Sequence, residues 1–178
     1  ARADVETGDE LEDLAEAFNT MLPKLEDRLR MREALSIARE VQQKLLPAAP
    51  PTIPGLDVAG DSLYCDETGG DYYDFIHVDE DHLGIVIADV SGKGVSGAIV
   101  MSICRSLLRT EAPGCLSPAH VLKNVSHTLS RDLSEDMFVS ILYMVLNTKT
   151  RELLVSRGGH VNPIVSPRVG GEARQIES

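Results

Sequence analysis

Apolar residues in the first part of the chain recur at spacings of three and four, with acidic residues between them. The series consists of Leu11, Leu14, Phe18, Met21 and Leu25. This spacing places the apolar side chains along one face of a helix and is typical of a coiled-coil seam. Pro23 lies inside the series, and proline ends or kinks a helix. We therefore expect two helical segments joined near residues 22–26 rather than one rod.

The helical pattern continues after Leu25, but its mainly apolar series follows a shifted frame. The later series consists of Leu35, Ala38, Gln42 and Leu45. Such a slip changes the supercoil of a coiled coil locally. Four prolines between positions 47 and 54 then end the pattern. They indicate a stiff linker and a domain boundary.

Beyond the prolines, short apolar stretches bounded by turn residues predict strands. The expected strands are 56–64, 71–78, 82–89, 137–146 and 152–156, and a hairpin turn at 147–151 joins the last two. Two helical stretches, 95–110 and 118–131, lie between the third and fourth strands. Ser117 is a natural N-cap for the second helix, and Pro118 suits its first position. Strands and helices in this order predict a domain of the α/β type.

The composition narrows the classes of function. The chain has 178 residues, a formal charge of −11 and three cysteines. The acidic balance argues against a nucleic-acid partner, which would need a basic patch. Cysteines without CxxC spacing suit reduced thiols in a cytosolic compartment. There is no apolar run of about 20 residues and no secretory signal. Because the chain begins with Ala1, we expect it to be a piece of a longer protein.

Two acidic stretches that contain glycine flank the apolar run 83–88, which we expect to be a buried strand. The first reads GGDYYDF from residue 69, and the second reads ADVSGKG from residue 88. An unpaired aspartate at the end of a buried strand is costly unless a cation neutralises it. Asp71 and Asp89 carry oxygen donors of the kind that bind Mg²⁺ or Mn²⁺. A plain turn would also explain the first stretch, and the second lacks the spacing of a phosphate-binding loop.

Four segments together resemble a known family. They read GGDYYDF, ADVSGKGVSGAIVMS, MFVSILYMVLN and GGHVNP, and they resemble the SpoIIE/RsbU-type branch of the metal-dependent (PPM) serine/threonine protein phosphatases. Residues 38–47 look like the linker that precedes this catalytic domain, and residues 8–21 are similar to the second helix of a HAMP signalling module. The resemblance implies a HAMP-like end at 1–30, a linker helix with its proline-rich boundary at 31–52, and a phosphatase domain at 53–178.

For the fold, the resemblance implies an α/β (α+β layered) structure, a PPM-type β-sandwich flanked by helices and preceded by a helical or coiled-coil segment. For the site, it implies a two-ion centre of Mn²⁺ or Mg²⁺ with Asp71 and Asp89 as catalytic ligands. Asp89 would bridge the ions, and Val90 would offer its backbone carbonyl. Two ions can activate a water for in-line attack on a phosphoryl group.

Two further residues belong to the motifs that carry the resemblance. Asp74 matches the first motif, and it is either a support for the metal ligands or a solvated side chain. His160 stands where the family more often shows Ala-Gly-His-Asn-Pro-Pro. Because of this departure, we interpret His160 as a structural histidine at the end of a strand.

The C-terminal part of the sequence departs from the family. A Tyr-Thr-Asp-Gly motif and a final aspartate, both metal-binding in the family, are absent, and the last aspartate here is Asp136. We therefore expect an incomplete metal site and a sandwich that is incomplete on one side. Open sheet edges invite pairing with another chain. We expect a homodimer that forms mainly through the N-terminal helices.

Two hypotheses for the function stay open. In the first, the chain is a phosphatase, or part of one, that acts on a phosphorylated STAS-type (anti-anti-sigma-like) protein in bacterial signalling. In the second, it is an inactive signalling and dimerisation fragment whose parent protein is the active enzyme. The parent would be a membrane-anchored sensor with this part on the cytoplasmic side. A diguanylate cyclase is excluded, because GGD is followed here by Tyr72 and Tyr73.

Overall fold

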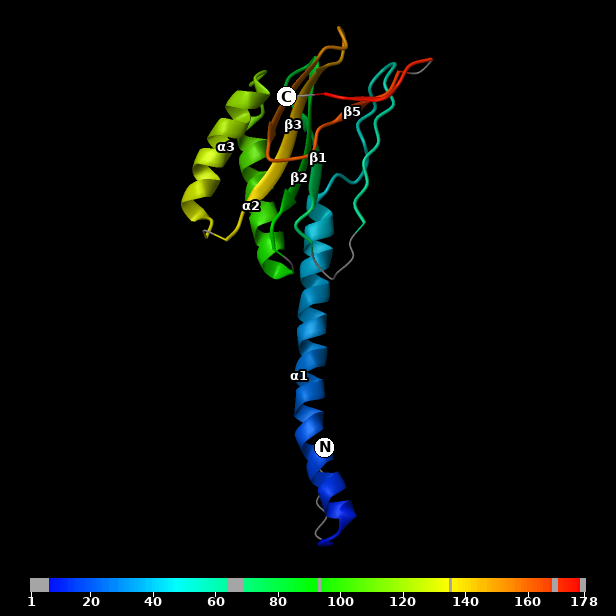
Figure 1. Cartoon of the computed structure of the whole chain (residues 1–178), viewed down its shortest axis with the longest axis vertical. Coiled ribbons are helices and arrows are strands. Elements are labelled where there is room, and N and C mark those ends of the chain that lie inside the picture. Colours follow the sequence, from blue (N-terminus) through cyan, green and yellow to red (C-terminus); the bar gives the residue numbers. More distant parts are fainter. Residues whose placement is uncertain (1–6, 64–68, 93, 135, 168–169, 177–178) are drawn as a thin grey trace.

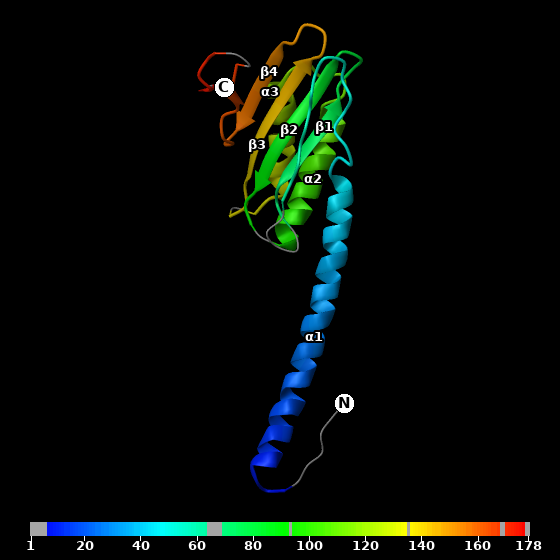
Figure 2. The same ribbon diagram turned by 90° about the vertical axis from the view of Figure 1, so that its right-hand side faces the viewer.

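One long helix, α1, runs from Glu10 to Leu45 and projects from an α/β domain (Figures 1 and 2). This computed structural model describes residues 7–63, 69–92, 94–134, 136–167 and 170–176. Asp9 caps α1 by accepting a hydrogen bond from the backbone N–H of Leu11 at 3.0 Å. Pro23 lies inside the helix, so the predicted break at residues 22–26 is wrong. Proline costs about 3 kcal/mol in a helix interior, and the strong helix formers on either side of it outweigh that cost.

The domain is built on a four-stranded antiparallel sheet in the order β1-β2-β3-β4. Its strands are β1 (Tyr72–His77), β2 (His82–Val90), β3 (Val139–Asn147) and β4 (Leu153–Gly158). Two helices, α2 (Val95–Glu111) and α3 (Pro118–Asp132), cover one face of this sheet (Figures 1 and 2). A short separate pair is formed by β5 (Ile164–Val165) and β6 (Arg174–Gln175).

Most of the predicted elements of the domain are confirmed. The expected strands at 71–78, 82–89, 137–146 and 152–156 and both expected helices are present, with ends shifted by a few residues. Ser117 caps α3 as predicted, because its hydroxyl oxygen accepts a hydrogen bond from the backbone N–H of His120 at 3.3 Å. Among the described residues, the sheets are this four-stranded one and the short β5–β6 pair. This mixed α/β architecture agrees with the predicted class.

No strand forms over the described part of the expected stretch 56–64. Leu56 takes part only in an isolated bridge to Ile53, and residue 64 lies outside the described residues. The stretch instead packs on the sheet, where Gly60 lies against the rings of Tyr73 and Phe75. A Cβ on Gly60 would approach the Tyr73 ring to 2.6 Å. This contact requires glycine, and glycine weakens strand pairing.

The two faces of the sheet have different surroundings, because successive side chains of a strand point to opposite sides. On the helix side, Val86 and Tyr143 are fully buried and pack in one cluster with Met101 and Leu108 of α2. On the other side, Ile87 is 43% exposed. The buried strand predicted over 83–88 forms within β2, and its residues are buried apart from Ile85, which is half-buried, and Ile87, which is exposed on the face away from the helices.

Asp74 lies on the helix side of β1 and is fully buried. Arg109 of α2 holds it with two hydrogen bonds, from Nε to Oδ2 at 2.6 Å and from Nη2 to Oδ1 at 2.8 Å. The hydroxyl of Tyr72 donates a third at 2.8 Å. Burial, and then the charge of Asp74, raise the pKa of Tyr72, so its hydroxyl remains a donor. The alternative that Asp74 is solvated is wrong: Asp74 anchors α2 to β1.

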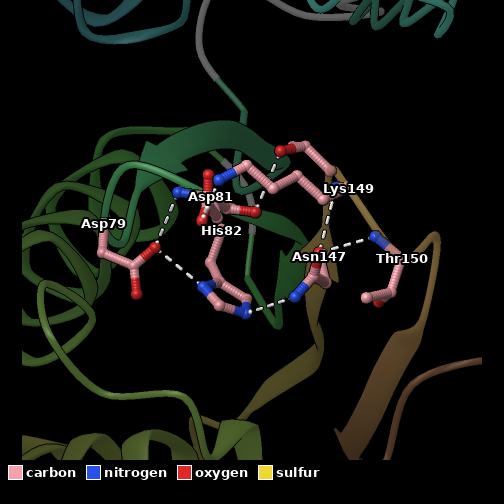
Figure 3. Close-up of polar contacts among 7 residues, drawn as sticks. Asp79, Asp81, His82, Asn147, Lys149 and Thr150 are labelled. Atoms are coloured by element: carbon pink, nitrogen blue, oxygen red, sulfur yellow. Dashed lines mark hydrogen bonds and ion pairs between the residues drawn. The ribbon is translucent and has the colours of Figure 1, made fainter.

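A polar cluster connects the two turns at the other end of the sheet (Figure 3). The Nδ1 of His82 is 2.7 Å from Oδ1 of Asp79, and Nδ2 of Asn147 donates to Nε2 of His82 at 3.0 Å. Lys149 pairs with Asp81 at 2.7 Å. These contacts join the β1–β2 turn to the β3–β4 turn. They give His82 a structural role, far along the strands from Asp89.

Candidate active site

Four polar side chains gather at the end of the sheet where β1 begins and β2 ends. Asp71 directly precedes β1, and Asp89 is the last residue but one of β2. The carboxyl groups of these two residues lie within hydrogen-bonding distance of each other. Ser140 of β3 is the register partner of Asp89. His160 follows β4, and its Nδ1 lies 2.9 Å from Oγ of Ser140.

These residues lie on the face of the sheet that the helices leave uncovered. Their neighbours Tyr72, Ala88 and Ile141 belong to the core on the helix side. Since side chains alternate along a strand, Asp71, Asp89 and Ser140 point to the opposite side. Both aspartates are exposed. A group on another molecule can therefore approach the two carboxyl groups from solvent.

Close backbone packing holds the two aspartates together. The backbone N–H of Val90 donates to the carbonyl oxygen of Gly70 at 3.4 Å. A Cβ on Gly70 would lie 2.6 Å from the carbonyl oxygen of Val90, so only glycine fits at this position. Gly97 of α2 also packs here, because a Cβ on Gly97 would lie 3.5 Å from the Cα of Gly70. The Val90 side chain is buried in the core, while its carbonyl oxygen stays beside Gly70.

The two carboxyl groups repel each other. Partial burial, followed by the charge of Asp89 and a hydrogen bond with its carboxyl group, raises the pKa of Asp71. The nearby His160 acts on that pKa in the opposite direction. A raised carboxyl pKa means that the folded chain holds the charged form of Asp71 at a cost in free energy. A bound cation would remove this cost.

The donor set at this point suits a hard divalent cation. Two carboxylates and the carbonyl of Val90 offer only oxygen atoms, which Mg²⁺ and Mn²⁺ prefer. Within the described residues, no group of three or more His, Cys, Asp or Glu side chains could hold a metal ion. Mg²⁺ often binds through one or two carboxylates and keeps several waters. The residues present therefore fit such an ion, and the role of Val90 as a ligand stays a prediction.

Sequence reasoning missed two residues of this region. Ser140 lies inside the MFVSILYMVLN segment, but only the register of β2 against β3 places it opposite Asp89. Gln42 of α1 is buried and hydrogen-bonds with both the carbonyl oxygen and the N–H of Gly69, two residues before Asp71. A signal for Gln42 did exist, because it is the polar member of an otherwise apolar series on the helix.

The structural interpretation of His160 stays a prediction, and the structure places this residue beside the carboxyl groups.

Comparison with known proteins gives a consistent family match. Residues 79–178 match the sequence profile of the family described as Stage II sporulation protein E (SpoIIE). The phosphoserine phosphatase RsbU of Bacillus subtilis is 30% identical over 130 residues, which are 73% of this chain and 38% of RsbU. The phosphoserine phosphatase RsbP of the same organism is 27% identical over 139 residues, 75% of this chain and 34% of RsbP. The chain thus spans little more than a third of the length of these relatives.

Solved structures support the same fold. The RsbU and RsbW domains of a Mycobacterium tuberculosis protein align over 65% of this chain and 32% of that chain, with 26% identity and a TM-score of 0.55. The SiaA-PP2C domain of Pseudomonas aeruginosa aligns over 74% of this chain and 55% of its own, with 19% identity and a TM-score of 0.58. The similarity to the SiaA-PP2C domain concerns the fold alone.

None of the helices in the described part of this chain is long and apolar enough to cross a membrane.

The repulsion between the carboxyl groups predicts the effect of Asp71→Asn on stability. Because the folded state raises the pKa of Asp71 above the usual range of an aspartate, deprotonation destabilises the fold as the pH rises through the folded pKa. In metal-free buffer at pH 7 we expect a higher Tm for D71N than for the wild type, and the difference should vanish below about pH 3.9, the pKa of an aspartate in an unfolded chain. Thermal melts followed by circular dichroism measure this.

The matched control is Asp57→Asn, which changes an exposed aspartate away from the site and should leave Tm unchanged. Saturating Mn²⁺ should raise the Tm of the wild type and of D57N but not that of D71N. A lower Tm for D71N in metal-free buffer would contradict the account of repulsion.

Proposed function

Since this chain belongs to the SpoIIE family, we propose that it forms part of a metal-dependent phosphatase that hydrolyses phosphoserine or phosphothreonine on a protein. The observation that carries the proposal is the juxtaposition of the exposed Asp71 and Asp89 carboxyl groups on the face of the sheet away from α2 and α3. The sequence relatives RsbU and RsbP are phosphoserine phosphatases, which supports the same class of reaction.

The chain's own residues would contribute position and charge. Asp71 and Asp89 would hold Mn²⁺ or Mg²⁺, with Asp89 between two ions and the carbonyl of Val90 as a further oxygen donor. Such ions supply a water of lowered pKa and neutralise charge on the phosphoryl group. The exposure of both carboxyl groups suits a phosphorylated side chain presented by another protein. Further ligands would come from water and from other parts of the parent protein.

We propose a phosphorylated STAS-type protein as the substrate, because the sequence motifs resemble a branch of the family with that substrate class. Residues 1–30 would be the end of a HAMP-like module and 31–52 the linker to the catalytic domain at 53–178. The parent protein would be a membrane-anchored sensor, with this part on the cytoplasmic side. In the parent, a second large sheet would cover the open face and complete the PPM-type sandwich.

The second candidate function is signalling by dimerisation without activity in this chain. It is favoured by the apolar seam of α1, where Leu14 is 66% exposed and Phe18 and Leu25 are also exposed. A separate apolar groove of about 540 Å³ lies between the C-terminal part of α1 and α2, and Val41, Ile99 and Ile103 are among the residues that line it. A seam of this kind would pair with the same seam of a second copy.

Hydrolysis of p-nitrophenyl phosphate tests the enzymatic proposal. With Mn²⁺ we expect activity in the wild type and a loss of at least about 100-fold in Asp89→Asn, because the variant removes one charge from the metal ligands. Asp57→Asn is the control and should keep full activity. The chain and its full-length parent are both assayed. Hydrolysis that D89N leaves intact in both would contradict the assignment, and activity restricted to the parent would favour the second candidate for this chain.

Sedimentation equilibrium tests the dimer. The double variant Leu14→Asp, Leu25→Asp places two charges in the seam, and we expect it to convert a dimer into a monomer. Glu16→Gln changes an exposed residue outside the apolar series and serves as the control. A wild type that sediments as a monomer, or a double variant that still sediments as a dimer, would contradict pairing through α1.

A further inference from the structure

Gln42 is one of two polar residues that are buried in the described chain, the other being Asp74. It lies in the last turns of α1, in a series whose other members are apolar. A buried amide has to find partners for its oxygen and its nitrogen. Gln42 finds both on a single residue outside the helix, which is Gly69.

The two hydrogen bonds resemble the pairing between neighbouring strands. The side-chain nitrogen of Gln42 donates to the carbonyl oxygen of Gly69. The backbone N–H of Gly69 donates to Oε1 of Gln42 at 3.2 Å. Both polar groups of Gly69 are thereby satisfied by one side chain. The amide therefore fixes the position and the orientation of this peptide relative to α1.

The position of Gly69 restricts the position of Asp71, because only the tightly packed Gly70 lies between them. Gly70, the residue between them, lies against the carbonyl oxygen of Val90 with no room for a Cβ. On the other side of Asp71, Asp74 is fixed by Arg109 of α2. Asp71 is thus held from both directions, by α1 before it and by α2 after it.

The end of α1 is itself fixed on the domain. Arg105 of α2 donates from Nε to the carbonyl oxygen of Leu45 at 2.7 Å. Arg105 and Arg109 are one turn apart on the same helix, so α2 holds both the end of α1 and the strand that follows Asp71. A change in the position of α1 would break either the Arg105 contact or the Gln42 contact.

We propose that Gln42 is a positioning residue that couples the linker helix α1 to the carboxylate of Asp71. It acts on the divalent-cation site through Gly69 and contacts neither the ion nor the substrate. This inference rests on the proposed metal site and goes beyond it, because it identifies the contact through which the placement of α1 sets the geometry of the site.

The test uses the matched pair Gln42→Leu and Gln43→Leu in the whole chain. The two variants make the same chemical change at neighbouring positions, and Gln43 is exposed. Mn²⁺ affinity is measured by calorimetry. Exchange of the Gly69 and Gly70 backbone amides is measured by NMR in metal-free protein, which is a readout that needs no activity.

For Q42L we expect Mn²⁺ affinity to fall by about 10-fold or more, the usual effect of losing a group that orients a metal ligand. The Gly69 amide should exchange about 10-fold faster, because its acceptor is gone. Q43L should match the wild type in both measurements. Gln42→Met, which keeps the length of the side chain, guards against misfolding of Q42L, and it should show the same losses with a Tm close to that of the wild type.

Wild-type affinity in Q42L and Q42M would overturn the proposal, as would a loss of affinity without faster exchange at Gly69. The phosphatase assignment fails separately. Tight Mn²⁺ binding and normal Gln42 effects without phosphate hydrolysis would remove the assigned reaction and leave the positioning role intact. A wild type that binds no Mn²⁺ would overturn both the metal site and the coupling to it.

Discussion

The repulsion between the carboxyl groups of Asp71 and Asp89 is the constraint on which this end of the molecule depends. Two like charges stay together only if the backbone leaves them no alternative, and here Gly70 is pressed against Val90 while β2 is paired on both sides. The packing that opposes the repulsion comes from the core and from α2. The protein therefore keeps a local free-energy cost that a divalent cation would remove.

Two aspartates three positions apart, Asp71 just before β1 and Asp74 within it, serve two different purposes. Asp74 faces the helices, is fully buried, forms an ion pair with Arg109 and accepts a hydrogen bond from the hydroxyl of Tyr72. Asp71 is exposed on the side away from α2 and α3 and has another carboxyl group as its neighbour. Asp74 is buried but the Arg109 side chain is 43% exposed, so solvent screens part of the ion pair. The hydrogen bonds from Arg109 and Tyr72 give Asp74 a structural role in the scaffold. The strand alternation alone separates the structural carboxylate from the candidate metal ligand.

The sequence was sufficient to predict the four main strands and the two helices between the second and third of them. The role of Asp71 and Asp89 as metal ligands stays a prediction. It was insufficient where tertiary contacts decide. Residues 56–63 pack on Tyr73 and Phe75 instead of pairing as a strand. The uninterrupted helix at Pro23 is a different case, because the helix formers on either side of the proline decide it. The motif does not distinguish Asp74 from Asp71. The difference depends on the contact between Asp74 and Arg109, which lies 35 positions later in the chain, and the sequence does not reveal that contact. The place of Ser140 opposite Asp89 follows only from the register of the strands. The role of Gln42 follows only from its contact with Gly69, which lies 27 positions later in the chain.

The central claim is that the two carboxyl groups form a site for a divalent cation. Anomalous diffraction at the manganese edge from crystals soaked in Mn²⁺ tests it most directly. The account predicts an anomalous peak between the carboxyl groups of Asp71 and Asp89, on the face of the sheet away from α2 and α3. Saturating Mn²⁺ that leaves this position without a peak, or a peak found only elsewhere on the protein, would contradict it.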